Sequence, residues 1–156
     1  MNRAFTMIEV VVVTVVIGIL AAMVIPKFAN AQQETTISAT AEDLRVIARA
    51  LSLYQGVHGK YPPSGSRAED AEVLEKYFKG TSPFEIQSPI GGVYDYDGYK
   101  HGVPLSVSII QDGSNRYSFE HAVELDELID NGDLGSGKLM EVGDKLRYRF
   151  YGNKAP

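Results

Sequence analysis

Oxygen-bearing side chains crowd together near the carboxyl end of the sequence. Asp126, Asp130, Asn131 and Asp133 fall within eight positions. Carboxylate and amide oxygens at such short spacing are the ligands that calcium prefers. The spacing does not match that of an EF-hand loop, and carboxylates in turns and at helix ends are common without a metal. We therefore treat Asp126, Asp130 and Asp133 as a candidate calcium site, and the alternative is a chain that needs no cofactor.

The same region resembles a nucleotide-binding loop. The segment from Gly132 to Lys138 matches the pattern G-x-x-x-x-G-K, but Leu139 stands where Mg²⁺ needs a serine or threonine hydroxyl. A predicted helix also precedes the segment, where a phosphate-binding loop follows a strand. We interpret it as a helix cap followed by a glycine-rich turn, and we expect no ATP binding.

Other groups capable of acid–base chemistry are scattered along the chain. His58, His101 and His121 fall in different predicted elements. Asp95 and Asp97 could form a carboxylate pair of the glycosidase kind, but alternate positions on a strand beside a glycine turn explain them more simply. The sequence therefore predicts that the protein is not an enzyme.

Composition narrows the functional classes further. The chain has 156 residues, a formal charge of -5 and no cysteine. The absence of cysteine excludes disulfides, thiolate catalysis and zinc–thiolate sites. An acidic balance without a cluster of Lys and Arg gives no reason to expect nucleic acid as a partner.

One carboxylate, Glu9, stands at the head of an apolar run that carries no charge before Lys27. A membrane span needs about 20 apolar residues, and counting from Phe5 provides them but places Glu9 in the hydrocarbon. A carboxylate there costs about 2.5–3.5 kcal/mol and is usually paired and functional. Glu9 should therefore have a partner.

Three interpretations fit this apolar segment. A secretory signal peptide would be cut after the A-x-A motif at 29–31, and a plain signal anchor would stay uncut. Both leave Glu9 unexplained. The third interpretation rests on Arg3 to Glu9, with the apolar run that follows, because this stretch resembles the leader and N-terminal helix of type IV pilins and type II secretion pseudopilins.

That resemblance implies a processing site and a role for Glu9. A prepilin peptidase would remove the leader 1–4 by cutting between Ala4 and Phe5, and would then methylate the new amino group of Phe5. Ala4 stands where the family nearly always has glycine. In a filament, Glu9 of one subunit would pair with the Phe5 amine of its neighbour.

The apolar run predicts one nearly continuous helix from about Thr6 to Gln55. Residues 5–28 would form its membrane and assembly half, and an apolar stripe from Ile37 to Tyr54 would pack on a head domain. Gly18 and Pro26 mark its weak part. A simple kink and local melting in the assembled filament remain alternatives there.

The head, residues 29–156, reads as α+β. Helices are predicted at Ser66 to Lys79 and at Ser118 to Asn131. A hairpin of residues 93–96 and 105–109 and a last strand at 146–151 predict a three- to four-stranded antiparallel sheet over the long helix.

We therefore expect a structural filament subunit of a type II secretion pseudopilus or type IV pilus. The resemblance implies a single-pass protein of the bacterial inner membrane, with its N-terminus in the cytoplasm and its head outside. Its partners would be its own copies, other pilins or pseudopilins, the prepilin peptidase, and an assembly platform with its ATPase. Leu53-Tyr54 and Tyr61-Pro62, the short head and the lack of cysteine favour the secretion side. The alternative is a tethered binding module with the helix only as its anchor.

Overall fold

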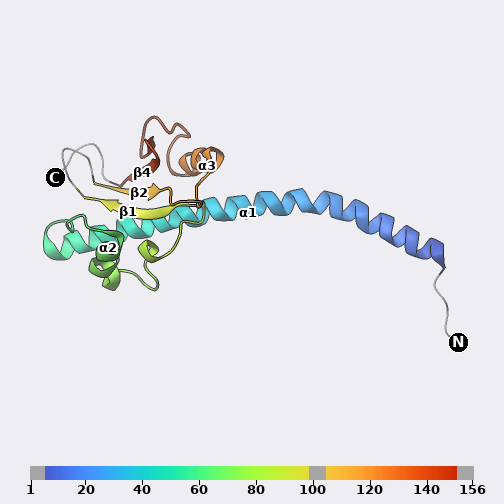
Figure 1. Ribbon diagram of the computed structural model, residues 1–156, viewed down its shortest axis with the longest axis horizontal. Coiled ribbons are helices and arrows are strands. Elements are labelled where there is room, and N and C mark those ends of the chain that lie inside the picture. The colour runs from blue at the N-terminus through green and yellow to red at the C-terminus, as the bar shows by residue number, and fades with distance from the viewer. Residues whose placement is uncertain (1–5, 99–104, 151–156) are drawn as a thin grey trace. The chain divides into compact units, whose positions relative to one another are not determined.

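The computed structural model describes residues 6–98 and 105–150, and it falls into two compact units, Met1–Thr35 and Thr36–Pro156 (Figure 1). Ala4 and Phe5 lie outside the described residues. The elements in chain order are α1 (Met7–His58), α2 (Arg67–Leu74), η1 (Glu75–Tyr77), η2 (Pro83–Glu85), β1 (Val93–Asp97), β2 (Ser106–Ile110), α3 (Phe119–Ile129), β3 (Leu139–Val142) and β4 (Lys145–Arg149).

The first unit contains the apolar part of α1. Its large apolar side chains remain exposed: Val16 is 50% exposed, Ile17 59% and Leu20 57%. A helix that is apolar on every side has no stable place in water, so this part of α1 requires lipid or the helices of other molecules around it.

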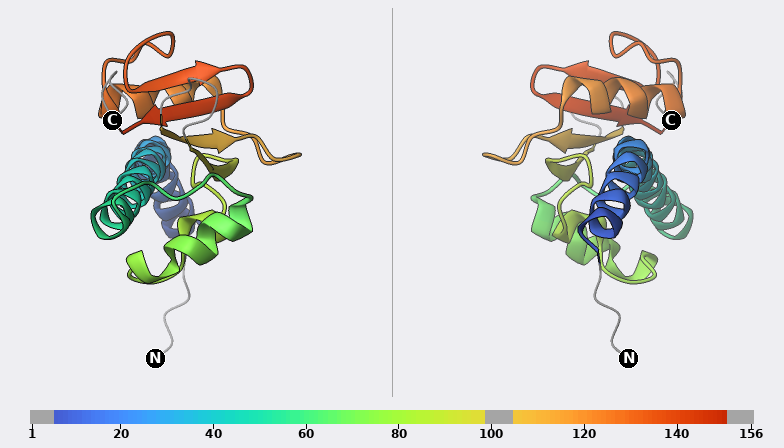
Figure 2. Two further views of the ribbon diagram at one scale, coloured as in Figure 1. Left: turned by 90° about the vertical axis from the view of Figure 1, so that its left-hand side faces the viewer. Right: turned by 90° about the vertical axis from the view of Figure 1, so that its right-hand side faces the viewer.

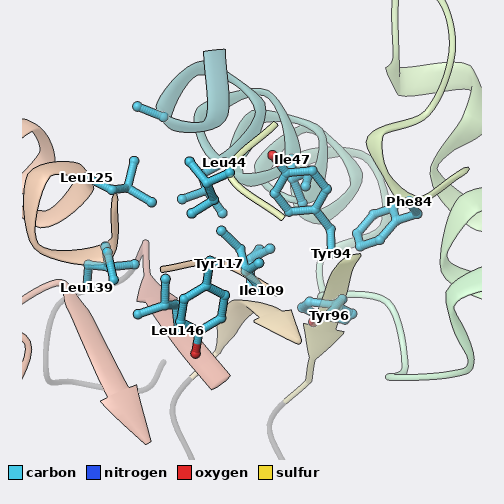
Figure 3. Close-up of a cluster of buried hydrophobic side chains, with 14 of the residues drawn as sticks. Leu44, Ile47, Phe84, Tyr94, Tyr96, Ile109, Tyr117, Leu125, Leu139 and Leu146 are labelled. Atoms are coloured by element: carbon cyan, nitrogen blue, oxygen red, sulfur yellow. The ribbon is translucent and has the colours of Figure 1, made fainter. Parts of the chain in front are cut away.

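The second unit is built around the amphipathic part of α1. The predicted apolar stripe is confirmed, because Ile37, Ala41, Leu44, Ile47 and Leu51 are all buried. Figure 3 shows Leu44 and Ile47 facing side chains of the sheet and of α3 across the core.

The sheet has four antiparallel strands in the order β1-β2-β4-β3. Its register places one alternating set of side chains against α1, including Tyr94, Ile109 and Leu146, which are fully buried. The opposite set is polar and includes Asp95, Ser108 and Arg147, which are aligned across three strands. The α+β class and the antiparallel sheet are confirmed.

Caps fix where the two short helices begin. Ser66 and Glu69 form a reciprocal capping box at α2, and the Ser118 hydroxyl accepts a hydrogen bond from His121 N at α3. Leu125 of α3 is buried in the same core as Leu44 of α1 and lies beside Leu139 of β3 (Figure 3).

The predicted elements differ from the observed ones in several places. The helix predicted over residues 66–79 is α-helical only over α2 and continues as the 3-10 helix η1. The long helix α1 continues past Gly56 to His58, and the chain turns at Gly59, which has φ of 70°. The sequence-based segments also left out β3, whose four residues pair with β4 through a two-residue turn at Gly143 and Asp144.

Candidate assembly site on the N-terminal helix

The N-terminal end of α1 is capped by a capping box between Thr6 and Glu9. Glu9 Oε2 accepts hydrogen bonds from the Thr6 backbone N–H at 2.8 Å and from the Thr6 hydroxyl at 2.7 Å. In return, the Glu9 N–H donates to Thr6 Oγ1 at 3.4 Å. A carboxylate in the first turn also interacts favourably with the positive end of the helix dipole. Glu9 therefore has a partner within its own chain.

The sequence contained the signal for this capping box. Thr-x-x-Glu before an apolar run is a pattern typical of a helix start. The partner expected for Glu9 was an amine of another subunit, so this partner within the chain was not predicted. Only Oε2 of the carboxylate serves the cap. Oε1 accepts no hydrogen bond from the part of the chain that the structure describes, so it is open to a second donor.

A shallow groove of about 320 Å³ lies beside the carboxylate. It is lined by Ile8, Glu9, Val12 and Val13, so apolar side chains surround a single charged group. Such a groove suits a donor that arrives attached to an apolar side chain.

The segment Met7–Ile25 is long and apolar enough to cross a membrane. Its polar residue Thr14 satisfies its own hydroxyl by donating to Val11 O at 2.9 Å, as hydroxyls in spanning helices must. Length and composition therefore fit a span that begins at the capping box.

The predicted weak points, Gly18 and Pro26, lie inside α1, which is helical across both positions. A Cβ added at Gly18 would meet no atom within 4 Å. Space for a side chain is therefore available at Gly18 in this unit. Local loosening between the two residues stays a prediction.

Two of the three candidate calcium residues, Asp130 and Asp133, accept hydrogen bonds from their own loop. Asp130 Oδ2 accepts a hydrogen bond from Lys138 N at 2.6 Å, and Asp133 accepts hydrogen bonds from Gly135 N at 3.0 Å and from the Ser136 hydroxyl at 2.8 Å. These bonds close the turn between α3 and β3. Across residues 6–98 and 105–150, no three His, Asp or Glu side chains are grouped to hold a metal ion.

Asp126 is the buried member of this set. It has no exposed surface, and neither carboxylate oxygen has a well-formed hydrogen bond within the described chain, although the backbone N–H groups of Gly132 and Asp133 lie near it. Burial raises the pKa of Asp126, and the nearby charge of Asp130 raises it further.

Two of the remaining candidates for chemistry, His58 and Asp97, contact neighbouring side chains. The His58 ring stacks on Tyr54 with 4.0 Å between ring centroids, and the Ser108 hydroxyl donates to Asp97. His101 lies outside the described residues. The segment Gly132 to Lys138 joins a helix to a strand, which is the reverse of the order in a phosphate-binding loop.

Comparison with known proteins relates the N-terminal sequence to a protein family. Residues 1–25 match the family described as "Prokaryotic N-terminal methylation motif". The chain is 32% identical over 104 residues to the type II secretion system core protein G of Pseudomonas aeruginosa, a match that covers 67% of this chain and 66% of that protein. The chain belongs to the type IV pilin and pseudopilin family.

A second relative extends the similarity over nearly the whole pseudopilin-like chain. The type II secretion system core protein G of Dickeya chrysanthemi is 24% identical over 154 residues, which cover 92% of this chain and 94% of that protein. The similarity to pseudopilins therefore includes the head as well as the N-terminal helix.

Proposed function

We propose that this chain is a structural subunit of a type II secretion pseudopilus and polymerises through the N-terminal half of α1. The observation that carries the proposal is the capped Glu9 at the start of an apolar helix segment whose large side chains are all exposed. The family match over residues 1–25 and two relatives named as secretion-system core proteins support it.

Processing would create the missing donor. Cleavage between Ala4 and Phe5 leaves an α-amino group on Phe5, and this amine of one subunit would bind Glu9 Oε1 of the next. The Phe5 ring would then enter the groove of Ile8, Val12 and Val13. At an effective dielectric constant near 20, a contact ion pair is worth about 4 kcal/mol, which is enough to select one register between apolar helices.

Location and partners follow from this proposal. Before assembly the chain would reside in the inner membrane with its N-terminus in the cytoplasm and its head in the periplasm. Its partners would be other copies, other pseudopilins, the prepilin peptidase, and an assembly platform driven by a separate ATPase.

Two substitutions at the capping box test the assembly role of Glu9. Glu9→Gln keeps a side chain of the same size but removes the charge, whereas Thr6→Val removes the two hydroxyl hydrogen bonds of the cap and keeps the charge. We expect Glu9→Gln to reduce pelletable filaments by tenfold or more, and Thr6→Val to have a much smaller effect. Filament yields that are normal for Glu9→Gln would refute the role of the charge.

A deletion of residues 1–28 separates the filament subunit from a tethered binder. The head alone should fail to assemble while retaining its fold. A head that keeps a specific ligand without the helix, in cells where the full chain makes no filaments, would favour the binding module.

A further inference from the structure

A cleft of about 630 Å³ lies between α2 and the segment that follows it. Its rim carries Glu72, Glu75 and Glu85, which are exposed, and its floor is formed by the buried side chains of Ala71 and Phe84. We refer to these five residues as the acidic cleft.

Arg67 is the one cation that lines this cleft, and its guanidinium is already bound to the main chain. Arg67 Nη2 donates to Phe84 O at 2.6 Å and lies 3.4 Å from Ile86 O. Arg67 keeps its charge, but three glutamates outnumber it among the lining residues, so the rim is negative on balance over an apolar floor. Such a surface is the complement of one that combines basic and apolar side chains.

α1 presents such a surface on the side that faces away from the core. Arg45, Arg49, Leu53 and Val57 follow one another at four-residue spacing and are all exposed, Leu53 by 50% and Val57 by 70%. We refer to these four residues as the basic stripe. Arg45 is held only loosely by Glu42, at 3.8 Å in an exposed pair.

The acidic cleft and the basic stripe belong to different elements of the head and share no residue. In both views of Figure 2, α2 lies below the sheet and to one side of α1. Two different, mutually complementary surfaces on one molecule generate a head-to-tail contact that repeats without closing, unless the rotation between copies closes a ring.

We propose that the basic stripe of one copy docks on the acidic cleft of the next copy in the filament. Arg45 and Arg49 would meet the glutamate rim, and Leu53 would cover the apolar floor. This inference rests on the proposed function, because it needs copies that are already aligned by their N-terminal helices. It adds a second contact between neighbouring copies, which is made by their heads. The opposite charges of the two surfaces determine which surface of one copy meets which surface of the next.

Cysteine cross-linking in the full-length chain tests the contact directly. The sequence contains no cysteine, so the introduced thiols are the only ones in the chain. Arg49→Cys combined with Glu72→Cys should give a ladder of oxidised multimers in assembling cells, and each single variant should not extend beyond a dimer. The matched control pairs Arg49→Cys with Asp144→Cys, an exposed acidic position on the turn between β3 and β4.

Charge exchange provides the second arm of the test. Glu72→Arg with Glu75→Arg should lower the filament yield several-fold, and Arg45→Glu with Arg49→Glu should do the same. The combination of all four changes should recover most of the lost yield. Circular dichroism of each variant checks that the head is folded.

The outcomes separate this inference from the proposed function. Filaments from the unmodified chain, without a ladder and without rescue, would overturn the head contact and leave the pseudopilus subunit intact. Cross-links to a different protein would likewise overturn a second copy as the occupant. If the unmodified chain forms no filaments in cells with the complete assembly machinery, both proposals fail.

Discussion

A single hydrogen bond joins two distant parts of the head at Tyr94. The fully buried Tyr94 hydroxyl donates to Asp43 Oδ2 at 2.9 Å and so ties β1 to α1. Burial raises the pKa of the Tyr94 phenol, so it remains a donor at every physiological pH, and burial also raises the pKa of Asp43. Sequence patterns predicted both elements but could not pair these residues, which are 51 positions apart.

Replacing Tyr94 with phenylalanine should destabilise the head. The change removes the donor and leaves the half-buried Asp43 carboxylate without that hydrogen bond, so we expect a loss of about 1–2 kcal/mol in the free energy of unfolding, measured by urea titration. Tyr77→Phe is the matched control, because the buried Tyr77 hydroxyl has no hydrogen-bond partner in the described chain. Equal effects of the two changes would contradict the assigned role of Tyr94.

A buried carboxylate gives the head a pH dependence. Asp70 is only 3% exposed; burial raises its pKa to about 6, with the charges of Asp95 and Glu69 adding to the effect. The unfolded value is near 3.8, so the folded head binds more protons than the unfolded chain between these two values. Its stability should therefore fall as the pH rises through this window.

Asp70→Asn should remove this penalty. The asparagine oxygen can still accept the hydrogen bond from Gly65 N, which Asp70 Oδ1 accepts at 3.2 Å. We expect the variant to be more stable than the natural head at pH 7.5 by about 1–2 kcal/mol, with a smaller difference at pH 4. Thermal melts at both pH values measure this, and a variant that is less stable at pH 7.5 would show that the charge is needed.

In the turn between α3 and β3, acidic side chains accept hydrogen bonds from donors of their own loop. Asp130 and Asp133 bind backbone and hydroxyl donors of the same loop. The crowding of oxygens is visible in the sequence, but the groups that they contact depend on the path of the loop. We propose that the loop needs no calcium for its fold.

Removing calcium with a chelator tests whether this loop needs the metal. The melting temperature of the head should be the same with EDTA and with millimolar calcium, and Asp130→Ala should lower it because Lys138 N loses its acceptor. A rise of several degrees on adding calcium, abolished in Asp130→Ala, would instead establish a calcium site at Asp126, Asp130 and Asp133.

At the same scale, periodicity predicted the helices and the first hairpin correctly. The buried positions of α1 repeat every three or four residues, and capping residues at Ser66 and Ser118 mark true helix starts. β3 was missed because its four residues, Leu139 to Val142, are too few to show alternation. The strand order β1-β2-β4-β3 depends on pairings across long loops, which no local pattern encodes.

For the molecule as a whole, the N-terminal residues provide the clearest sequence evidence of function. Glu9 was identified from its cost in a membrane, and the structure added that Thr6 already caps it. The amine that would complete the site belongs to Phe5, which lies outside the described residues. In the proposed assembly this amine would become free only after processing, so the complete site would need both cleavage and a second molecule.

Mass spectrometry of the mature N-terminal peptide, isolated from cells that express the prepilin peptidase, shows directly whether the Phe5 amine becomes free. We predict a chain that begins at a methylated Phe5, and the full-length form should accumulate when the peptidase is absent. A mature chain that begins at Met1, Asn2 or Gln32 under the same conditions would contradict this prediction, because Glu9 would then never meet a free Phe5 amine.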